Sequence, residues 1–235
     1  LGIYEIGFLW SIPVSLLVII AIMNAFNLID GVDGLASGLG ILGSTILGLW
    51  FYHAKEFVFA IIALSLSGSL VGFFYYNVFG KKYKLFLGDT GALIMGMIIA
   101  TLIIKFNEVS LTFQGNLSVK NAPVISLGLI IVPIVDTIRV IFIRIRQNRS
   151  PFSADNNHIH HRIFYFFKRH IVITTILVSI NLLMFAFSVY LNQTHININF
   201  QMLILVLTTL SILTIPYLLI KMNGFHQKDL KGTSK

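Results

Sequence analysis

Seven apolar stretches, each long enough or nearly long enough to cross a lipid bilayer, dominate the chain. A membrane-spanning helix needs about 20 mostly apolar residues. The stretches that meet or approach this length are residues 6–26, 35–52, 57–79, 91–106, 122–146, 171–191 and 201–221. Only 11% of the residues are charged, whereas about 25% is usual in soluble domains. The sequence therefore predicts an all-α fold, a polytopic membrane helical bundle of seven transmembrane helices.

No soluble linker interrupts these stretches, so residues 1–235 are predicted to form a single integral membrane domain with no separate soluble domain. The chain opens on Leu1 and enters its first apolar stretch almost at once, which we interpret as the C-terminal part of a longer chain. Cysteine is absent, which excludes a disulfide framework and a Cys-ligated metal. The basic residues lie in short loops between spans, which argues against nucleic acid as a partner.

The distribution of lysine and arginine predicts the orientation. Seven spans alternate the loops between two sides. Fourteen of the seventeen lysines and arginines fall on the side that holds residues 27–34, 80–90, 147–170 and the C-terminal tail, when the three arginines over residues 139–146, at the end of the fifth span, are counted with it. Cytoplasmic loops carry such an excess, so this side is predicted to face the cytoplasm. The formal net charge of +8 suits an anionic inner leaflet or a phosphate-bearing substrate.

Two aspartates, Asp30 and Asp33, lie where the first apolar stretch ends, and each is followed by a glycine. Ionisable groups beside a spanning helix are functional candidates by default, because a charge inside the bilayer is costly. The glycines free the backbone to bend, so we expect a shaped pocket wall here; a polar helix end with a glycine cap is the alternative. Asn27, three residues before Asp30, lies on roughly the same helical face.

A third acidic residue of interest, Asp89, directly precedes the fourth span. Gly88 and Gly91 permit a tight turn around it, and Thr90 is predicted to cap the helix that follows. The backbone amides at such a helix N-terminus favour anions, phosphate included. A capped helix start with its customary aspartate is the alternative.

Residues 149–162 contain three histidines within four positions, His158, His160 and His161, between Arg149 and Arg162. Packing rarely explains such a cluster, so we assign it a function. Neutral imidazoles bind metal ions, whereas cationic or donor side chains hold phosphate. Local spacing does not decide between these two roles.

Asp136 is the one acidic residue placed inside a predicted span. Arg139 follows three residues later, so an intrahelical ion pair is expected to neutralise it. This structural role is preferred over a catalytic one. His53, His170, His195 and His226 stand alone near span ends and are assigned no role.

If the loops of Asp30 and Asp89 converge, their two carboxylates share a small space. At 4 Å and an effective dielectric constant near 20, the repulsion is about 4 kcal/mol. A divalent cation removes that cost, and Mg²⁺ takes one or two carboxylates with phosphate oxygens and waters. The predicted site binds a metal-held polyphosphate at the cytoplasmic surface of the lipid bilayer, which suits the joining of a water-soluble nucleotide to a lipid.

Three motifs together closely resemble the polyprenyl-phosphate N-acetylhexosamine-1-phosphate transferases, glycosyltransferase family 4. The motifs are Asn-Leu-Ile-Asp-Gly-Val-Asp-Gly-Leu-Ala at 27–36, Phe-Leu-Gly-Asp-Thr-Gly at 86–91 and His-Ile-His-His-Arg at 158–162. The family includes enzymes that start wall teichoic acid and O-antigen synthesis, and the MurNAc-pentapeptide translocase. The resemblance runs from about residue 6 to residue 190.

This resemblance implies a Mg²⁺-dependent transfer, with Mn²⁺ as an alternative ion, from a UDP-N-acetylsugar to undecaprenyl phosphate with release of UMP. The implied metal ligands are Asp89, Asn27 and Asp30. The implied catalytic residues are Asp30, Asp89, His158, His160 and His161, and the implied substrate-binding residues are Asp33, Phe86, Asn77, Arg149, Asp155 and Arg162. Asp33 and Phe86 would lie near the uracil, and the histidines would bind the diphosphate.

The spaced His-x-His-His form resembles the UDP-GlcNAc-using branch, so UDP-GlcNAc is the expected donor and wall teichoic acid or a related surface glycan the expected pathway. UDP-MurNAc-pentapeptide is the alternative donor, and a membrane transporter is a distant alternative, since the far side of the bundle is nearly bare of polar groups. The family's Asp-Asp pair is absent from this chain, so we expect the segment alone to be inactive. The oligomeric state is left open, with a homodimer as one alternative.

Overall fold

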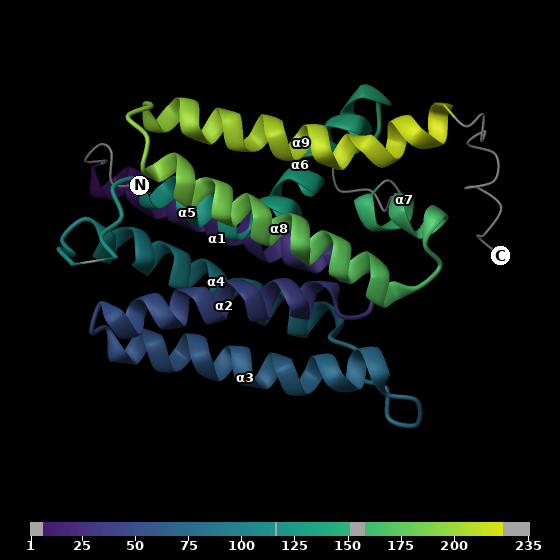
Figure 1. Cartoon of the computed structure of the whole chain (residues 1–235), viewed down its shortest axis with the longest axis horizontal. Coiled ribbons are helices and arrows are strands. Elements are labelled where there is room, and N and C mark those ends of the chain that lie inside the picture. The colour runs from purple at the N-terminus through teal and green to yellow at the C-terminus, as the bar shows by residue number, and fades with distance from the viewer. Residues whose placement is uncertain (1–6, 116, 151–157, 223–235) are drawn as a thin grey trace.

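The computed structural model describes residues 7–115, 117–150 and 158–222, and its regular elements there are all helices. Six of them are long and apolar enough to cross a membrane. They are α1 (Phe8–Ile29), α2 (Leu35–His53), α3 (Phe57–Phe79), α4 (Gly88–Ser110), α8 (His170–Asn192) and α9 (Ile198–Met222). Figure 1 shows these helices side by side along the long axis, with α3 at one edge and α9 at the other. The predicted polytopic helical bundle is confirmed.

The stretch predicted as one span over 122–146 is broken in the structure. It forms α5 (Ala122–Leu129) and α6 (Ile131–Arg146), which meet at an angle of 76°. Pro133 explains the break, because proline has no N–H to donate to the carbonyl of Leu129 four residues earlier and its ring crowds that carbonyl. Asn181 of α8 replaces the missing contact: its Nδ2 donates to Leu129 O at 2.7 Å, and its Oδ1 accepts from Val132 N at 3.1 Å.

Small residues bring some helices close together. A Cβ at Gly96 of α4 would lie 2.8 Å from the Met23 backbone of α1, and one at Gly48 of α2 would lie 2.8 Å from the Leu64 side chain of α3. Gly68 and Gly72 of α3, by contrast, have open space where a Cβ would stand. Close packing therefore accounts for the glycines between α1 and α4 and between α2 and α3, but not for those on the outer face of α3.

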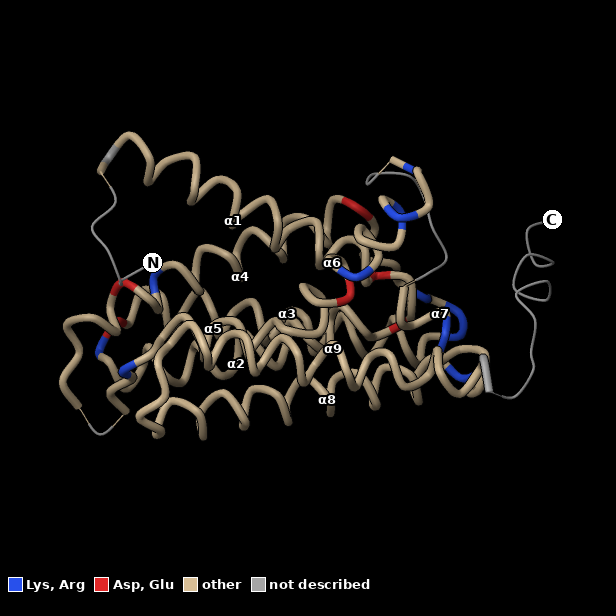
Figure 2. The backbone as a smooth tube through the Cα atoms, turned by 90° about the horizontal axis from the view of Figure 1, so that it is seen from above, with Lys and Arg blue, Asp and Glu red and all other residues tan. Residues whose placement is uncertain are grey.

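Charged residues gather at the two ends of the bundle and leave its middle apolar (Figure 2). One end carries the α1–α2 turn, the loop over residues 80–87 and the short helix α7 (Ile159–Phe166). This end holds most of the described lysines and arginines. It is also the end that the lysine and arginine count predicts to be cytoplasmic, and every predicted site residue within the described ranges belongs to it.

Candidate functional site

The turn between α1 and α2 places Asp30 and Asp33 at the charged end of the bundle. Helix α1 ends at Ile29, and the chain then turns sharply through Gly34, whose φ is +81°. L-residues rarely adopt this conformation, and a Cβ there would also lie 2.6 Å from Val78 and 2.8 Å from Phe74. Both the backbone angle and the available space therefore require glycine at position 34.

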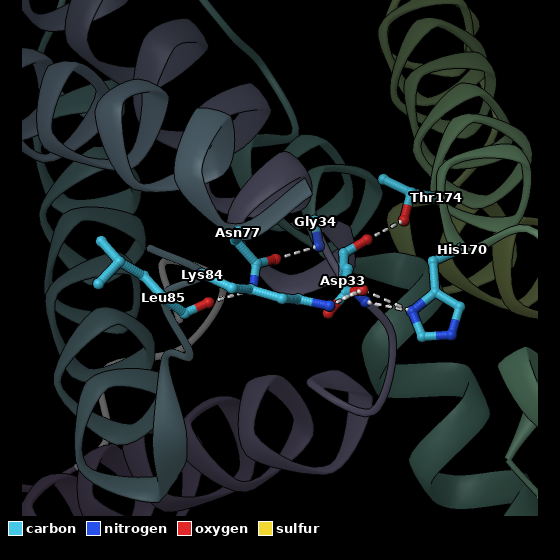
Figure 3. A network of polar contacts seen from close by, with 7 residues as sticks. All are labelled: Asp33, Gly34, Asn77, Lys84, Leu85, His170 and Thr174. Atoms are coloured by element: carbon cyan, nitrogen blue, oxygen red, sulfur yellow. Dashed lines mark hydrogen bonds and ion pairs between the residues drawn. The ribbon is translucent and has the colours of Figure 1, made fainter. Parts of the chain in front are cut away.

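Asp33 is held by contacts from two distant elements (Figure 3). Its Oδ2 lies 2.6 Å from Lys84 Nζ in the 80–87 loop and 2.8 Å from His170 Nδ1 at the start of α8. Its carbonyl oxygen accepts a hydrogen bond from Thr174 Oγ1 at 2.8 Å. The Asp33 amide also donates a hydrogen bond to His170 Nδ1 at 3.3 Å. The sequence assigned His170 no role, and no motif marked it.

Asn77, a predicted substrate-binding residue, bridges two loops. Its Oδ1 accepts a hydrogen bond from Gly34 N at 2.6 Å, and its Nδ2 donates to Leu85 O at 2.7 Å (Figure 3). The side chain is buried at the end of α3. Asn77 therefore fixes the spacing between the α1–α2 turn and the 80–87 loop, and its contact with a substrate stays a prediction.

A cleft of about 480 Å³ opens beside Asp33. Its lining residues come from the α1–α2 turn, the end of α3, the 80–87 loop and the start of α8: Asp33, Val78, Phe79, Lys84, Arg169, His170 and Ile171. The cleft is lined by both apolar and cationic side chains, and it lies where α3 ends and α8 begins. Its composition suits a molecule with an anionic part and a flat or apolar part.

Phe86 stands at the surface beside this cleft, with 74% of its area exposed. Lys84 Nζ lies 5.3 Å from the centroid of its ring, a cation–π contact. The exposed ring is available for stacking, as the prediction of uracil binding requires.

Helix α4 begins at Gly88, whose φ is +65°. The predicted cap by Thr90 is wrong: the cap residue is Leu87, no side chain caps the helix, and Thr90 already lies inside it. The helix starts earlier than the apolar run because Gly88 turns the chain directly into it. Asp89 therefore occupies the first turn, where a carboxylate interacts favourably with the helix dipole.

The carboxyl groups of Asp30, Asp33 and Asp89 lie close enough for their charges to act on one another. The pKa of Asp30 is raised to about 7, first by burial of its carboxyl and then by the negative charges of Asp33 and Asp89. A bound cation would relieve both effects, because it stabilises the ionised carboxylate. The structure thus brings together the acidic loops that the sequence predicts to converge.

The histidine cluster packs directly against this turn. Helix α7 starts just after His158, and His158 and His160 are both buried. A Cβ at Gly31 would lie only 2.5 Å from His160 Nε2, so the absence of a side chain at Gly31 makes room for the His160 ring. Within the described residues, His160 Nδ1 is buried and has no hydrogen-bond partner. Burial, then the charge of His161, lowers the pKa of His160 to about 3, so its ring is neutral at physiological pH.

Asp136 forms the predicted ion pair, with Arg139 Nη2 at 2.7 Å from its Oδ1. It also makes contacts that the sequence did not predict: His158 Nδ1 lies 3.0 Å from its Oδ2, and the Ile159 amide donates to Oδ1 at 3.0 Å. Spacing gave no signal for these contacts, because the partners are 22 and 23 residues apart in sequence. Asp136 therefore joins α6 to the N-terminal end of α7, which we call the histidine helix.

The remaining predicted residues lie around α6 and α7. Arg149 follows α6, and its amide donates to Arg144 O at 2.9 Å. The Arg162 guanidinium lies 4.7 Å from the Tyr217 ring centroid, so α7 also contacts α9. Asp155 lies outside the described residues.

Within the described ranges, no group of three His, Asp or Glu side chains is arranged to hold a metal ion. The donors near the turn are two carboxylates, Asp30 and Asp89, and the amide of Asn27 at the end of α1. Such a set fits Mg²⁺, which usually takes one or two carboxylates and completes its shell with waters and substrate phosphates. It does not fit a metal caged by protein ligands alone.

Residues 1–107 match the profile of glycosyl transferase family 4. A probable undecaprenyl-phosphate N-acetylglucosaminyl 1-phosphate transferase of Bacillus subtilis (strain 168) is 37% identical over 168 residues, which cover 71% of this chain and 44% of that protein.

Two relatives described as undecaprenyl-phosphate alpha-N-acetylglucosaminyl 1-phosphate transferase are also similar. The protein of Yersinia pestis is 32% identical over 152 residues, 64% of this chain and 40% of its own length. The protein of Escherichia coli (strain K12) is 30% identical over 151 residues, 63% of this chain and 39% of its own length. The chain thus spans about two fifths of the length of the curated relatives it matches.

Proposed function

Because residues 1–107 match glycosyl transferase family 4, we propose that this chain belongs to that family and carries the active site of an enzyme that transfers N-acetylglucosamine 1-phosphate from UDP-GlcNAc to undecaprenyl phosphate. The products are GlcNAc-diphospho-undecaprenol and UMP. The observation that carries this proposal is the meeting of the Asp30 turn, Asp89 and the histidine helix at one end of an apolar bundle. The names of the relatives support the acceptor, undecaprenyl phosphate, and the transferred group, N-acetylglucosamine 1-phosphate.

In the proposed reaction, a phosphate oxygen of undecaprenyl phosphate attacks the β-phosphorus of UDP-GlcNAc. A phosphorus–oxygen bond forms to the lipid phosphate, the bond between the two nucleotide phosphates breaks, and its electron pair leaves with UMP. Phosphoryl transfer depends mainly on positioning and on stabilisation of charge at the phosphate oxygens. The site offers both, since hydrogen bonds fix the α1–α2 turn and the cationic side chains Lys84 and Arg169 line the adjacent cleft.

The nucleotide is proposed to lie with its uracil between Asp33 and Phe86. The Asp33 carboxylate is fixed by Lys84 and His170, and the Phe86 ring is exposed for stacking. Asn77 holds the two loops at a fixed distance. This arrangement orients the base before the diphosphate reaches the reacting groups, which lowers the entropic cost of the reaction.

The diphosphate is proposed to reach the histidine helix. His160 lies against the Asp30 turn, and His158 and His161 flank it in sequence. Arg149 and Arg162 would add positive charge for the diphosphate, and Asp155, outside the described residues, stays a predicted substrate-binding residue. Asp89, Asp30 and Asn27 would hold Mg²⁺, or Mn²⁺ in its place. When bound, the ion neutralises charge on the diphosphate oxygens. The two carboxylates and the raised pKa of Asp30 support this assignment.

We place the site at the cytoplasmic surface of the bacterial plasma membrane. The lysine and arginine excess at this end supports the orientation, and a site at the end of apolar helices can meet both a soluble nucleotide and a lipid phosphate. The product would begin a cell-surface glycan such as wall teichoic acid or a lipopolysaccharide O-antigen.

An assay of the full-length gene product with labelled UDP-GlcNAc and undecaprenyl phosphate tests this function. Labelled lipid should form from UDP-GlcNAc and not from UDP-MurNAc-pentapeptide, and Asp89→Asn should abolish nearly all of it. Glu108→Gln, at the opposite end of the same helix α4, is the matched control and should keep full activity. Lipid product from the pentapeptide donor alone would contradict the donor, and full activity of Asp89→Asn would contradict the site.

A further inference from the structure

Asp136 makes more contacts than neutralisation of a buried acid requires. Its side chain is only 2% exposed and is already paired with Arg139 on the same helix. A neutral residue would avoid the cost of burying a charge at this position. Yet both carboxylate oxygens also receive hydrogen bonds from the start of the histidine helix, at His158 Nδ1 and at the Ile159 amide.

We propose that Asp136 is a positioning residue, which keeps the proton of His158 on Nδ1 and thereby presents Nε2 of this ring to a phosphate oxygen of the reacting substrates. The proposal rests on the proposed function and deepens it, because it separates the roles of the neighbouring histidines. From that phosphate oxygen Nε2 takes a proton, which a phosphate monoester carries in part near neutral pH. Once protonated, Nε2 donates a hydrogen bond back to the phosphate.

The two carboxylate oxygens have different principal donors. Oδ1 accepts from Arg139 Nη2 at 2.7 Å and from the Ile159 amide at 3.0 Å. Oδ2 accepts from His158 Nδ1 at 3.0 Å, with a longer contact of 3.3 Å from the Ile159 amide. Because a carboxylate only accepts hydrogen bonds, Nδ1 must carry a proton. Nε2 is then the one ring nitrogen of His158 that can act on a substrate.

The neighbouring histidine lacks such a partner. The rings of His158 and His160 are nearly parallel, with an interplanar angle of 7° and centroids 5.7 Å apart. His160 Nδ1 has no hydrogen-bond partner within the described residues, and burial lowers the pKa of His160 to about 3. His160 therefore serves as a neutral group, whereas His158 is backed by a carboxylate in the way that orients histidine in acid–base catalysis.

The substitution Asp136→Asn tests the proposal because its hydrogen-bonding outcome is predictable. Arg139 and the Ile159 amide are both donors to Oδ1, so they keep the asparagine oxygen at that place. The NH₂ group then takes the place of Oδ2 and faces His158 Nδ1, which can meet it only as an acceptor. The proton of His158 should move to Nε2, and Nε2 should lose its ability to accept a proton.

The first measurement is ¹⁵N NMR of the full-length gene product labelled at histidine, with His158 identified by the signal that His158→Gln removes. We expect a protonated Nδ1 in the wild type and a protonated Nε2 in Asp136→Asn. Glu108→Gln, which changes another carboxylate three residues from its cation, should leave the spectrum unchanged. A wild-type His158 with its proton on Nε2, or an unchanged His158 in Asp136→Asn, would overturn the proposal. The wild-type spectrum decides the question even if Asp136→Asn fails to fold.

The second measurement is the steady-state rate with UDP-GlcNAc and undecaprenyl phosphate. Asp136→Asn should lower kcat by about 100-fold or more, the usual range for loss of a general acid or base, with a smaller change in KM, and Asp136→Glu should recover part of the loss. Adding Asp136→Asn to His158→Gln should cost nothing further, since Asp136 acts through His158; multiplied losses would contradict this. An inactive wild-type protein would contradict the proposed function and leave the NMR result decisive.

Discussion

At the scale of single residues, Gly31 decides how closely the histidine helix approaches the acidic turn. A Cβ at this position would stand 2.5 Å from His160 Nε2, closer than such atoms approach in proteins. We expect Gly31→Ala to push the His160 ring aside and to lower kcat by about 10- to 100-fold, because small displacements of positioned groups are costly. Kinetics of the full-length gene product measure this.

The control for Gly31→Ala is Gly72→Ala in α3, where a Cβ meets open space. The control substitution should leave kcat unchanged and should not lower the thermal midpoint of unfolding, because alanine favours a helix over glycine. Equal losses in the two variants would show that the contact between Gly31 and His160 has no part in catalysis.

Asp30 gives the site a predictable dependence on pH. Its pKa is raised to about 7 by burial and by the charges of Asp33 and Asp89, from the 3.8 of a free aspartate. Folding therefore favours the protonated carboxyl, and the associated stability is lost as the pH rises from about 4 through about 7. In metal-free buffer, Asp30→Asn should raise the thermal midpoint more at pH 8 than at pH 5.

Mg²⁺ should offset the stability advantage of Asp30→Asn at pH 8, because only the wild-type carboxylate can help to bind the ion. The wild type should then gain more thermal stability from Mg²⁺ with UDP than Asp30→Asn does, as linkage to binding requires. An effect of Asp30→Asn that is the same at both pH values would contradict the raised pKa.

At the scale of elements, the long helices could be predicted and the short or broken ones could not. Six spans follow from apolar runs that match the thickness of a bilayer. The break at Ile130 depends on Pro133 and on Asn181, a residue of another helix that satisfies the freed backbone groups. Helix α7 is eight residues long and has no apolar run of its own, so only its histidines drew attention.

In the candidate site, too, some features could be predicted from the sequence and others could not. Motifs identified the acidic turn, Asp89 and the histidines, because their residue types are unusual beside a membrane. The supporting contacts join positions far apart in sequence: His170 meets Asp33 across 137 residues, and Asp136 meets His158 across 22. Hydropathy and spacing carry no information on such pairs.

The bend between α5 and α6 gives a prediction at this scale. Asn181→Leu removes both hydrogen bonds that satisfy the break, to Leu129 O and from Val132 N. Each buried group left without a partner costs about 1–3 kcal/mol, so the variant should unfold at a clearly lower temperature and lose activity as α6 shifts. Leu183→Ala, an exposed position of the same helix α8, is the control, and an equal loss there would contradict the role of Asn181.

At the scale of the whole molecule, the absence of cysteine from the chain makes its orientation easy to test. Single cysteines in place of Lys82, at the end with the site, and of Lys120, at the other end, can be labelled with a membrane-impermeant thiol reagent. In sealed spheroplasts or protoplasts, Lys120→Cys should react with the reagent, whereas Lys82→Cys should react only after lysis. The reverse pattern would place the site outside the cell.

The central claim is that the Asp30 turn, Asp89 and the histidine helix surround one metal-held nucleotide. An experimental structure of the full-length gene product with UDP and Mn²⁺ in place of Mg²⁺ tests it most directly, since anomalous scattering locates the ion. The account predicts the ion at the Asp89 and Asp30 carboxylates, with the diphosphate between them and His160. An ion and nucleotide bound together elsewhere, with no contact to these side chains, would contradict it.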